Sequence, residues 1–134
     1  MARVFVSRFR VRSYELDFLG HVNNAVYLNW LEQARLQALG ELGYPLEALI
    51  ERAWVTLVAR IEIDYRREVR HGDDIRLRTE VERVGRTSLT LHHRFERIDD
   101  EVPLVAEARV VIVWIGQDGR PAPVPDEVRE RLRS

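Results

Sequence analysis

The sequence predicts an α+β domain in which one long central helix packs on a mostly antiparallel five-stranded sheet. Three observations carry this prediction: an early segment alternates apolar and polar residues, a long helical stripe follows it, and four more alternating segments come after the helix. Short turns join these later segments, which favours antiparallel neighbours. Because a chain of 134 residues can bury one core, we expect a single domain over 1–134.

The first strand is predicted over 5–13, where apolar residues at odd-numbered positions alternate with arginines. After an irregular stretch, apolar residues recur every three or four positions from Tyr27 to Leu42, which predicts the long helix. Asn23 or Asn24 is expected to cap its N-terminus by accepting hydrogen bonds from backbone N–H groups. Glycines and a proline near the end of the stripe mark where the helix stops.

Four further strands are predicted after the helix, at 59–66, 75–81, 89–95 and 105–115. Turns rich in glycine and aspartate separate them, and 121–134 predicts a tail with a short helix. The last strand ends in consecutive apolar residues, as expected where both faces are covered. One helix covers only one face of a sheet, so this surplus apolar surface predicts a subunit interface. The two sets of residues are Val110, Ile112 and Trp114, and Val111, Val113 and Ile115.

The composition excludes several classes of chemistry. The chain has no cysteine, which rules out disulfides, thiolate metal sites and a cysteine nucleophile. All 21 basic residues are arginine, which rules out a Schiff-base lysine and a P-loop lysine. A net charge of -1 gives no field that attracts nucleic acid, and the longest apolar run, 110–115, is too short to span a membrane. We expect a soluble, cytoplasmic protein without a metal ion, a cofactor or a nucleic-acid partner.

One segment suggests catalysis, because Asp17 stands seven residues before Asn24, where the long helix is expected to begin. Unpaired N–H groups and the positive end of the helix dipole favour an anion there, including the oxyanion that forms when a carbonyl is attacked. Gly20 would permit a tight bend, and His21 could contact a substrate or steer the loop. The same residues also have ordinary roles: the aspartate and the asparagines as caps or turn formers, and His21 as a structural hydrogen-bond partner.

Four other polar residues are interpreted as structural. His92 and His93 are neighbours on a predicted strand, so their side chains point to opposite faces and cannot bind one metal ion together. Asp73 and Asp74 follow a glycine in a predicted turn, where bonding to the local backbone is the usual role of aspartate. No catalytic role is assigned to these residues.

The stretch from Asp17 to Tyr27 has the pattern Asp-x-x-x-His-Val-Asn-Asn-x-x-Tyr. With this pattern the chain resembles the 4-hydroxybenzoyl-CoA thioesterase-like hot-dog superfamily, especially its bacterial long-chain acyl-CoA thioesterase branch. The resemblance covers nearly the whole chain: 27–35 is similar to the family's central helix, 63–67 to its second strand and 85–88 to its third turn. It implies a hot-dog fold and hydrolysis of a medium- to long-chain fatty acyl-CoA.

The resemblance also implies roles for individual residues. The aspartate at the position of Asp17 attacks the thioester carbonyl or activates a water molecule, and the backbone N–H of Asn24 polarises the carbonyl oxygen. His21 completes the catalytic group. The site lies between two subunits, so we expect a homodimer as the minimum unit, paired further into a homotetramer. The expected substrate contacts are Asn23, Tyr27, Arg86, Thr87 and Ser88, of which the last three are candidates to contact the pantetheine or phosphates of CoA.

Three alternatives to an acyl-CoA thioesterase stay open. Plant acyl-ACP thioesterases have a similar pattern, Asp-x-Asn-x-His-Val-Asn-Asn, but Leu19 stands where that pattern has asparagine, which favours CoA as the carrier. A hot-dog hydratase pairs a histidine with an acidic residue on its helix in a motif that this sequence lacks. A non-catalytic acyl-CoA binder would not need Asp17. We expect Tyr27, Leu31 and Trp54 to line an apolar pocket that favours fatty-acyl chains.

Overall fold

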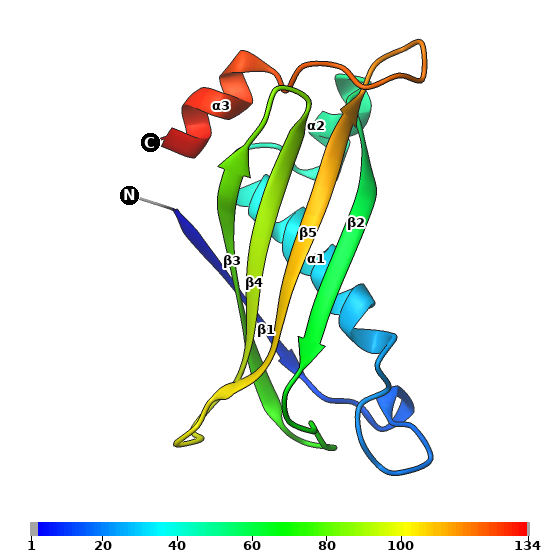
Figure 1. Cartoon of the computed structure of the whole chain (residues 1–134), viewed down its shortest axis with the longest axis vertical. Helices are drawn as coiled ribbons and strands as arrows, with labels where there is room; N and C mark the ends of the chain where they lie inside the picture. The colour runs from blue at the N-terminus through cyan, green and yellow to red at the C-terminus, as the bar shows by residue number, and fades with distance from the viewer. Residues whose placement is uncertain (1–2, 134) are drawn as a thin grey trace.

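The computed structural model describes residues 3–133, so both ends of the predicted domain 1–134 lie outside the described residues. Within them the strands are ordered β1-β3-β4-β5-β2, and all neighbours are antiparallel. The helix α1 lies across one face of this sheet (Figure 1). The predicted α+β arrangement is confirmed. The elements are β1 (Val4–Arg10), η1 (Ser13–Glu15), α1 (Val26–Glu41), α2 (Leu46–Glu51), β2 (Val55–Tyr65), β3 (Asp74–Val84), β4 (Ser88–Arg97), β5 (Leu104–Ile115) and α3 (Asp126–Arg133).

Some boundaries differ from the prediction. β1 ends at Arg10 rather than at 13, because the chain turns into η1, where the carboxylate of Glu15 accepts the Arg12 N–H at 2.8 Å. β2 begins before the predicted 59, because 55–58 also pairs with β5. The short helix α2 was not predicted. Pro45, interpreted as the end of the long helix, directly precedes α2, a place that proline tolerates because no intrahelical N–H bond is lost there.

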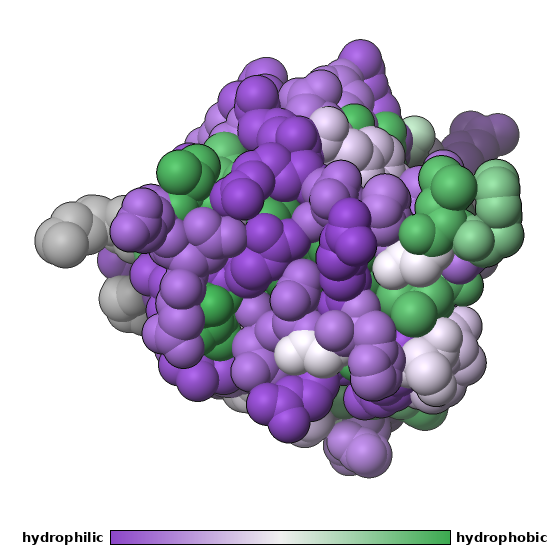
Figure 2. Space-filling view, turned by 90° about the horizontal axis from the view of Figure 1, so that it is seen from below, coloured by the Kyte–Doolittle hydropathy of each residue, from purple (hydrophilic) through white to green (hydrophobic). Residues whose placement is uncertain are grey.

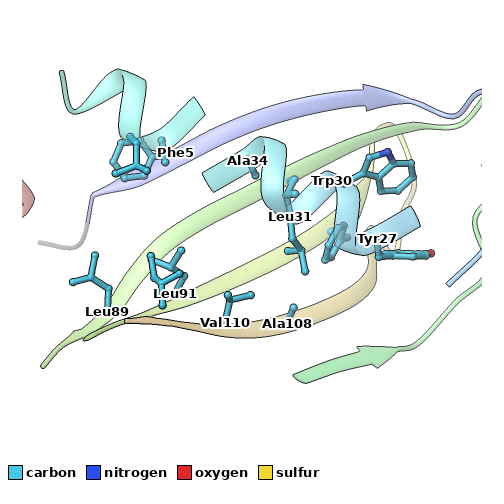
Figure 3. Close-up of a cluster of buried hydrophobic side chains, with 14 of the residues drawn as sticks. Phe5, Tyr27, Trp30, Leu31, Ala34, Leu89, Leu91, Ala108 and Val110 are labelled. Atoms are coloured by element: carbon cyan, nitrogen blue, oxygen red, sulfur yellow. The ribbon is translucent and has the colours of Figure 1, made fainter. Parts of the chain in front are cut away.

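The core lies between α1 and the sheet. Across from the helix, Leu91, Ala108 and Val110 point up from β4 and β5 (Figure 3). Ala34 is fully buried, and its small side chain lets the helix approach the strands. Burial of each large apolar side chain contributes roughly 1.5–3 kcal/mol, which holds the helix and its N-terminus against the sheet. The buried residues of α1 are Tyr27, Trp30, Leu31, Ala34, Ala38 and Leu39.

The opposite face of the sheet is partly charged and partly apolar. On this face the buried carboxylate of Glu96 accepts hydrogen bonds from Arg76 at 3.1 Å and Arg78 at 2.8 Å. The surplus apolar surface predicted on β5 continues on the edge strand β2. On β5 the half-buried residues of this face are Val111, Val113 and Ile115. On β2 the exposed Val55 and Leu57 lie on the same face, because they pair with Ile115 and Val113. No helix within 3–133 is long and apolar enough to cross a membrane.

Candidate active site

Asp17 lies in a loop that folds back on itself between η1 and α1. Its Oδ1 atom accepts hydrogen bonds from the backbone N–H groups of Leu19 at 2.9 Å and His21 at 3.1 Å. The Asp17 N–H donates to the His21 carbonyl at 2.7 Å, and Gly20 makes the bend with a φ of +81° that favours glycine. The carboxylate is therefore held through one oxygen. No residue within 3–133 donates to its Oδ2 atom, which is open to a substrate or to water.

The backbone of Asn24 lies at the entry to α1. The helix begins at Val26 with Ala25 as its N-cap, so the prediction that Asn23 or Asn24 is the N-cap is wrong. Asn23 acts just before the helix instead, because its Oδ1 accepts the Ala25 N–H and its carbonyl accepts the Val26 N–H, each at 2.9 Å. The Asn24 N–H donates to no residue that the structure describes. A backbone donor beside the start of a helix favours a negatively charged group.

Asp17 and Asn24 both border one open depression of about 350 Å³. Four of the residues predicted for the site line it, Asp17, His21, Asn24 and Tyr27, so the fold brings them together. The other wall comes from the end of β2 and the residues after it, including Tyr65, Arg66, Arg67 and Glu68. Figure 2 looks onto this end of the molecule, where hydrophilic surface is interrupted by a hydrophobic area on the side where Figure 1 shows the loop.

Tyr27 forms a rigid wall of the depression. Burial raises the pKa of its phenol to about 12, so the hydroxyl stays neutral and can donate a hydrogen bond at physiological pH. Its ring packs edge-on against Tyr65 and Phe95, with centroids 5.0 and 5.2 Å away. Tyr27 therefore offers a substrate an apolar ring in a fixed position.

Two residues that the sequence reasoning missed also organise the site. The buried carboxylate of Glu15 accepts the indole N–H of Trp30 at 3.1 Å. Tyr65, on the edge strand, donates its hydroxyl to the Asn24 carbonyl at 3.0 Å. Glu15 stands three residues after Arg12, as in a capping box, and this spacing is a local sequence signal for the role of Glu15. The contact of Tyr65 joins positions 41 apart and leaves no local pattern in the sequence.

Comparison with known proteins identifies the family. A sequence model described as the Thioesterase-like superfamily matches residues 11–132. The chain belongs to this superfamily. The members of this superfamily are thioester hydrolases, and they include acyl-CoA thioesterases, as the pattern from Asp17 to Tyr27 implied.

Individual relatives agree with this assignment. A long-chain acyl-CoA thioesterase of Escherichia coli is 30% identical over 94% of this chain and 95% of its own length. A chloroplastic acyl-acyl carrier protein thioesterase of Arabidopsis thaliana is 25% identical over 92% of this chain, which spans 64% of that protein's length. A solved thioesterase of Thermus thermophilus, complexed with coenzyme A and zinc, is 38% identical with a TM-score of 0.81, covering 96% of this chain and 90% of that one. The predicted hot-dog fold is confirmed.

The turn that the superfamily resemblance implicates in substrate binding lies at the other end of the sheet. β2 links the two ends: Tyr65 contacts Asn24, while Val55 pairs with Ile115 beside the start of β4. At about 3.3 Å per residue, a strand of this length separates its ends by roughly 30 Å. Within one chain, this turn does not border the Asp17 depression. Its predicted contact residues are Arg86, Thr87 and Ser88.

The residues predicted to line an acyl pocket are also dispersed. Tyr27 borders the depression, whereas Leu31 is packed in the core with 2% of its surface exposed. Trp54 lies at the far end, with its ring 5.2 Å from that of Tyr44 and 5.8 Å from that of Trp114. In a single chain these three residues do not form one pocket.

The residues interpreted as structural do form structural contacts. His92 and His93 point to opposite faces of β4, as predicted: His92 pairs with Glu107 at 3.1 Å, and the buried His93 bonds to Thr79 at 2.9 Å. Asp73, just before β3, forms an ion pair with Arg97, and Asp74, the first residue of β3, forms one with Arg10. Within 3–133 no three histidine, aspartate or glutamate side chains gather as a metal ion requires.

Proposed function

We propose that this protein hydrolyses fatty acyl-CoA thioesters to the free acid and CoA at the Asp17 depression. One observation carries the proposal: Asp17, whose Oδ2 accepts no hydrogen bond within 3–133, and Asn24, whose N–H donates none there, border the same depression. Hydrolysis of a thioester needs a group that attacks the carbonyl carbon or activates a water molecule to do so. It also needs a donor that stabilises the oxyanion. The identity of 30% with a long-chain acyl-CoA thioesterase supports CoA as the carrier.

Asp17 acts in one of two ways. As a nucleophile, its Oδ2 attacks the carbonyl carbon, the C–S bond breaks, the CoA thiolate leaves and is protonated by solvent, and water hydrolyses the acyl anhydride. As a general base, it takes a proton from water, the hydroxide attacks, and the proton passes to the departing sulfur. In both routes the carbonyl oxygen becomes anionic and accepts the Asn24 N–H. His21 and Asn23 act as neighbouring polar contacts to the substrate.

A medium- to long-chain fatty acid is the proposed acyl group. The long-chain relative supports this choice, and so do the apolar side chains around the site. The Tyr27 ring forms one wall, and on the loop itself Phe18 is 96% exposed and Leu19 is 64% exposed. Exposed apolar side chains gain from covering a hydrocarbon chain, at about 0.8 kcal/mol for each buried methylene group.

An acyl carrier protein is the alternative carrier, because the Arabidopsis relative is an acyl-acyl carrier protein thioesterase. Both carriers present the thioester on the same phosphopantetheine arm, so the reaction at Asp17 is identical. Leu19, in place of the asparagine of the plant pattern, favours CoA. The ratio of kcat/KM for one acyl group on CoA and on the carrier protein distinguishes the two carriers.

We propose a homodimer as the minimum active unit, paired further into a homotetramer. The length of β2, at about 3.3 Å per residue, separates the Arg86 turn from the depression of its own chain by roughly 30 Å. Only a second copy of the chain could therefore bring an Arg86 turn to the site. β2 supports pairing, because an unpaired edge strand with exposed apolar side chains such as Leu57 favours contact with another chain. Light scattering coupled to size exclusion, together with activity at increasing dilution, tests this assembly. Full activity in a monomer would contradict it.

Release of free thiol from a panel of short, long and aromatic acyl-CoAs tests the reaction. We expect turnover with the fatty-acyl members of the panel. A non-catalytic acyl-CoA binder would bind the same compounds, measured by calorimetry, without releasing thiol. A cytoplasmic location stays a prediction from the sequence.

A further inference from the structure

Glu15 is a buried carboxylate next to the proposed active site, and the proposed reaction does not use it. Only 6% of its surface is exposed. Its Oε1 accepts the Arg12 N–H at 2.8 Å, and its Oε2 accepts the indole N–H of Trp30 at 3.1 Å. Both oxygens are therefore used as acceptors from two separate parts of the chain. A buried carboxylate is costly unless such donors compensate for the lost water.

The partner on α1 is rigid. Trp30 is 2% exposed, and its ring stacks on Phe9 of β1 at 5.6 Å with an interplanar angle of 15°. It also contacts the rings of Tyr27 and Phe95. The indole N–H is thus fixed in the core, and Glu15 is tied to a point that does not move with the loop.

The backbone of Glu15 closes the base of the catalytic loop. Its carbonyl accepts the Asn23 N–H at 2.9 Å, and the next pair along the loop is the bridge between Leu16 and Val22. These two pairs form the base of the loop. Asp17 directly follows Leu16 of one pair, and Asn24 directly follows Asn23 of the other. The position of Asp17 relative to the Asn24 N–H therefore depends on how the base is held.

We infer that Glu15 is a positioning residue: its carboxylate anchors the loop base to Trp30 and so sets the Asp17 carboxylate against the Asn24 N–H. This inference rests on the proposed function. Reacting groups must be placed accurately, since a displacement of about 1 Å can reduce a rate by about a hundredfold. Glutamine has the same shape but only one acceptor oxygen, so Glu15→Gln turns an N–H donor toward Arg12 or Trp30 and weakens the anchor.

Glu96 offers a matched control, because it is also a buried carboxylate with two donors. Its exposed fraction is 8%, and it accepts hydrogen bonds from Arg76 and Arg78 on the outer face of the sheet. A general loss of stability from removing a buried charge applies to Glu15→Gln and Glu96→Gln alike. A displacement of the Asp17 carboxylate is expected only in Glu15→Gln.

The test compares Glu15→Gln, Trp30→Phe and Glu96→Gln with the wild type, using lauroyl-CoA as substrate. We expect Glu15→Gln to lower kcat about tenfold or more and to leave KM within about twofold of the wild-type value. Trp30→Phe should also lower kcat, but by a smaller factor. Glu96→Gln lowers the melting temperature and leaves kcat within about twofold. In an Asp17→Asn background, Glu15→Gln lowers kcat no further, since the two residues act through one carboxylate.

The amide resonances of Leu19 and His21 give a readout that does not depend on activity, because both N–H groups bond to Asp17. We expect them to shift in Glu15→Gln and in Trp30→Phe but not in Glu96→Gln. Unshifted resonances, a kcat loss equal to that of Glu96→Gln, or an undiminished further loss in the Asp17→Asn background would overturn the inference. If Glu15→Gln does not fold, Trp30→Phe decides by the same criteria. A wild type that releases no thiol from any acyl-CoA contradicts the proposed function, while the resonances still test the anchor.

Discussion

The loop end and the turn end of the sheet are built differently. At the loop end, Asp17 and the Asn24 backbone are held by hydrogen bonds from Leu19, His21 and Tyr65. At the turn end, only the backbone is held: the Arg86 carbonyl accepts bonds from Val124 and Arg129, and the Arg86 side chain is exposed. One end presents a fixed carboxylate and a fixed donor, and the other presents a charge on an exposed side chain.

This difference matches what each end is proposed to do. Attack on a carbonyl needs atoms in fixed positions, whereas a guanidinium can bind a phosphate through several geometries. It also shows what is missing in one chain, because the two ends lie roughly 30 Å apart by the length of β2. In the proposed dimer, the loop end of one chain supplies the reacting groups, and the turn end of the partner chain supplies the phosphate contact.

The largest expected effect belongs to the loop end. We expect Asp17→Asn to lower kcat by about two orders of magnitude or more, because it removes the group that attacks or activates water. Release of thiol under substrate saturation measures this change, and circular dichroism checks the fold. Asp118→Asn, in an exposed turn at the other end, is the matched control and keeps wild-type kcat. Near wild-type turnover by folded Asp17→Asn would remove the distinction between the two ends.

A smaller effect is expected at the turn end. Arg86→Ala should raise KM for acyl-CoA about tenfold through a lost phosphate contact, and leave KM for the matching acyl-pantetheine unchanged. Titration of both substrates against the variant measures this difference. An equal rise in both values would contradict a phosphate contact.

Mixing the two variants tests whether the ends come from different chains. If each site takes Asp17 from one chain and Arg86 from its partner, a mixed dimer of Asp17→Asn and Arg86→Ala has one intact site. An equal mixture at low substrate should then recover about a quarter of wild-type activity by random pairing. Activity equal to the mean of the separate variants would mean that the sites are not shared.

The acyl group gives a finer test of the loop end. We expect kcat/KM to rise with each added methylene group by at most about fourfold, the equivalent of about 0.8 kcal/mol. The rise should stop when the acyl chain extends beyond the apolar surface around Tyr27. A series from acetyl-CoA to palmitoyl-CoA measures the trend. The highest kcat/KM for acetyl-CoA, with a steady fall along the series, would rule out a fatty-acyl substrate.

The region between the two ends should affect stability and not catalysis. Burial lowers the pKa of His93 to about 3, below the 6.5 of an exposed histidine, so between these values the unfolded chain binds a proton that the folded chain does not. Stability therefore falls as pH falls through this window, by at most about 1.4 kcal/mol per pH unit. Urea unfolding from pH 7 to 5 measures the slope. His93→Gln should reduce the slope and keep kcat at neutral pH, and an unchanged slope would contradict the assignment.

The sequence by itself determined the strands, the long helix and the segment that borders the depression. Alternation of period two and a stripe of period 3.6 are local consequences of burying one face, so the strands and the long helix followed from them. The pattern from Asp17 to Tyr27 located the depression for a similar reason, since a loop and the helix that follows it are neighbours in the chain as well as in space.

Only the tertiary structure decided how distant residues meet. The bond from Tyr65 to Asn24 and the bond from Trp30 to Glu15 depend on how β2 and α1 pack, which no local pattern encodes. The same packing separates the Arg86 turn from Asp17 by the length of a strand, although the resemblance assigned both to one site. Local backbone preferences act over a few residues, whereas these distances are fixed by sheet order and by burial of the core, which are properties of the whole fold.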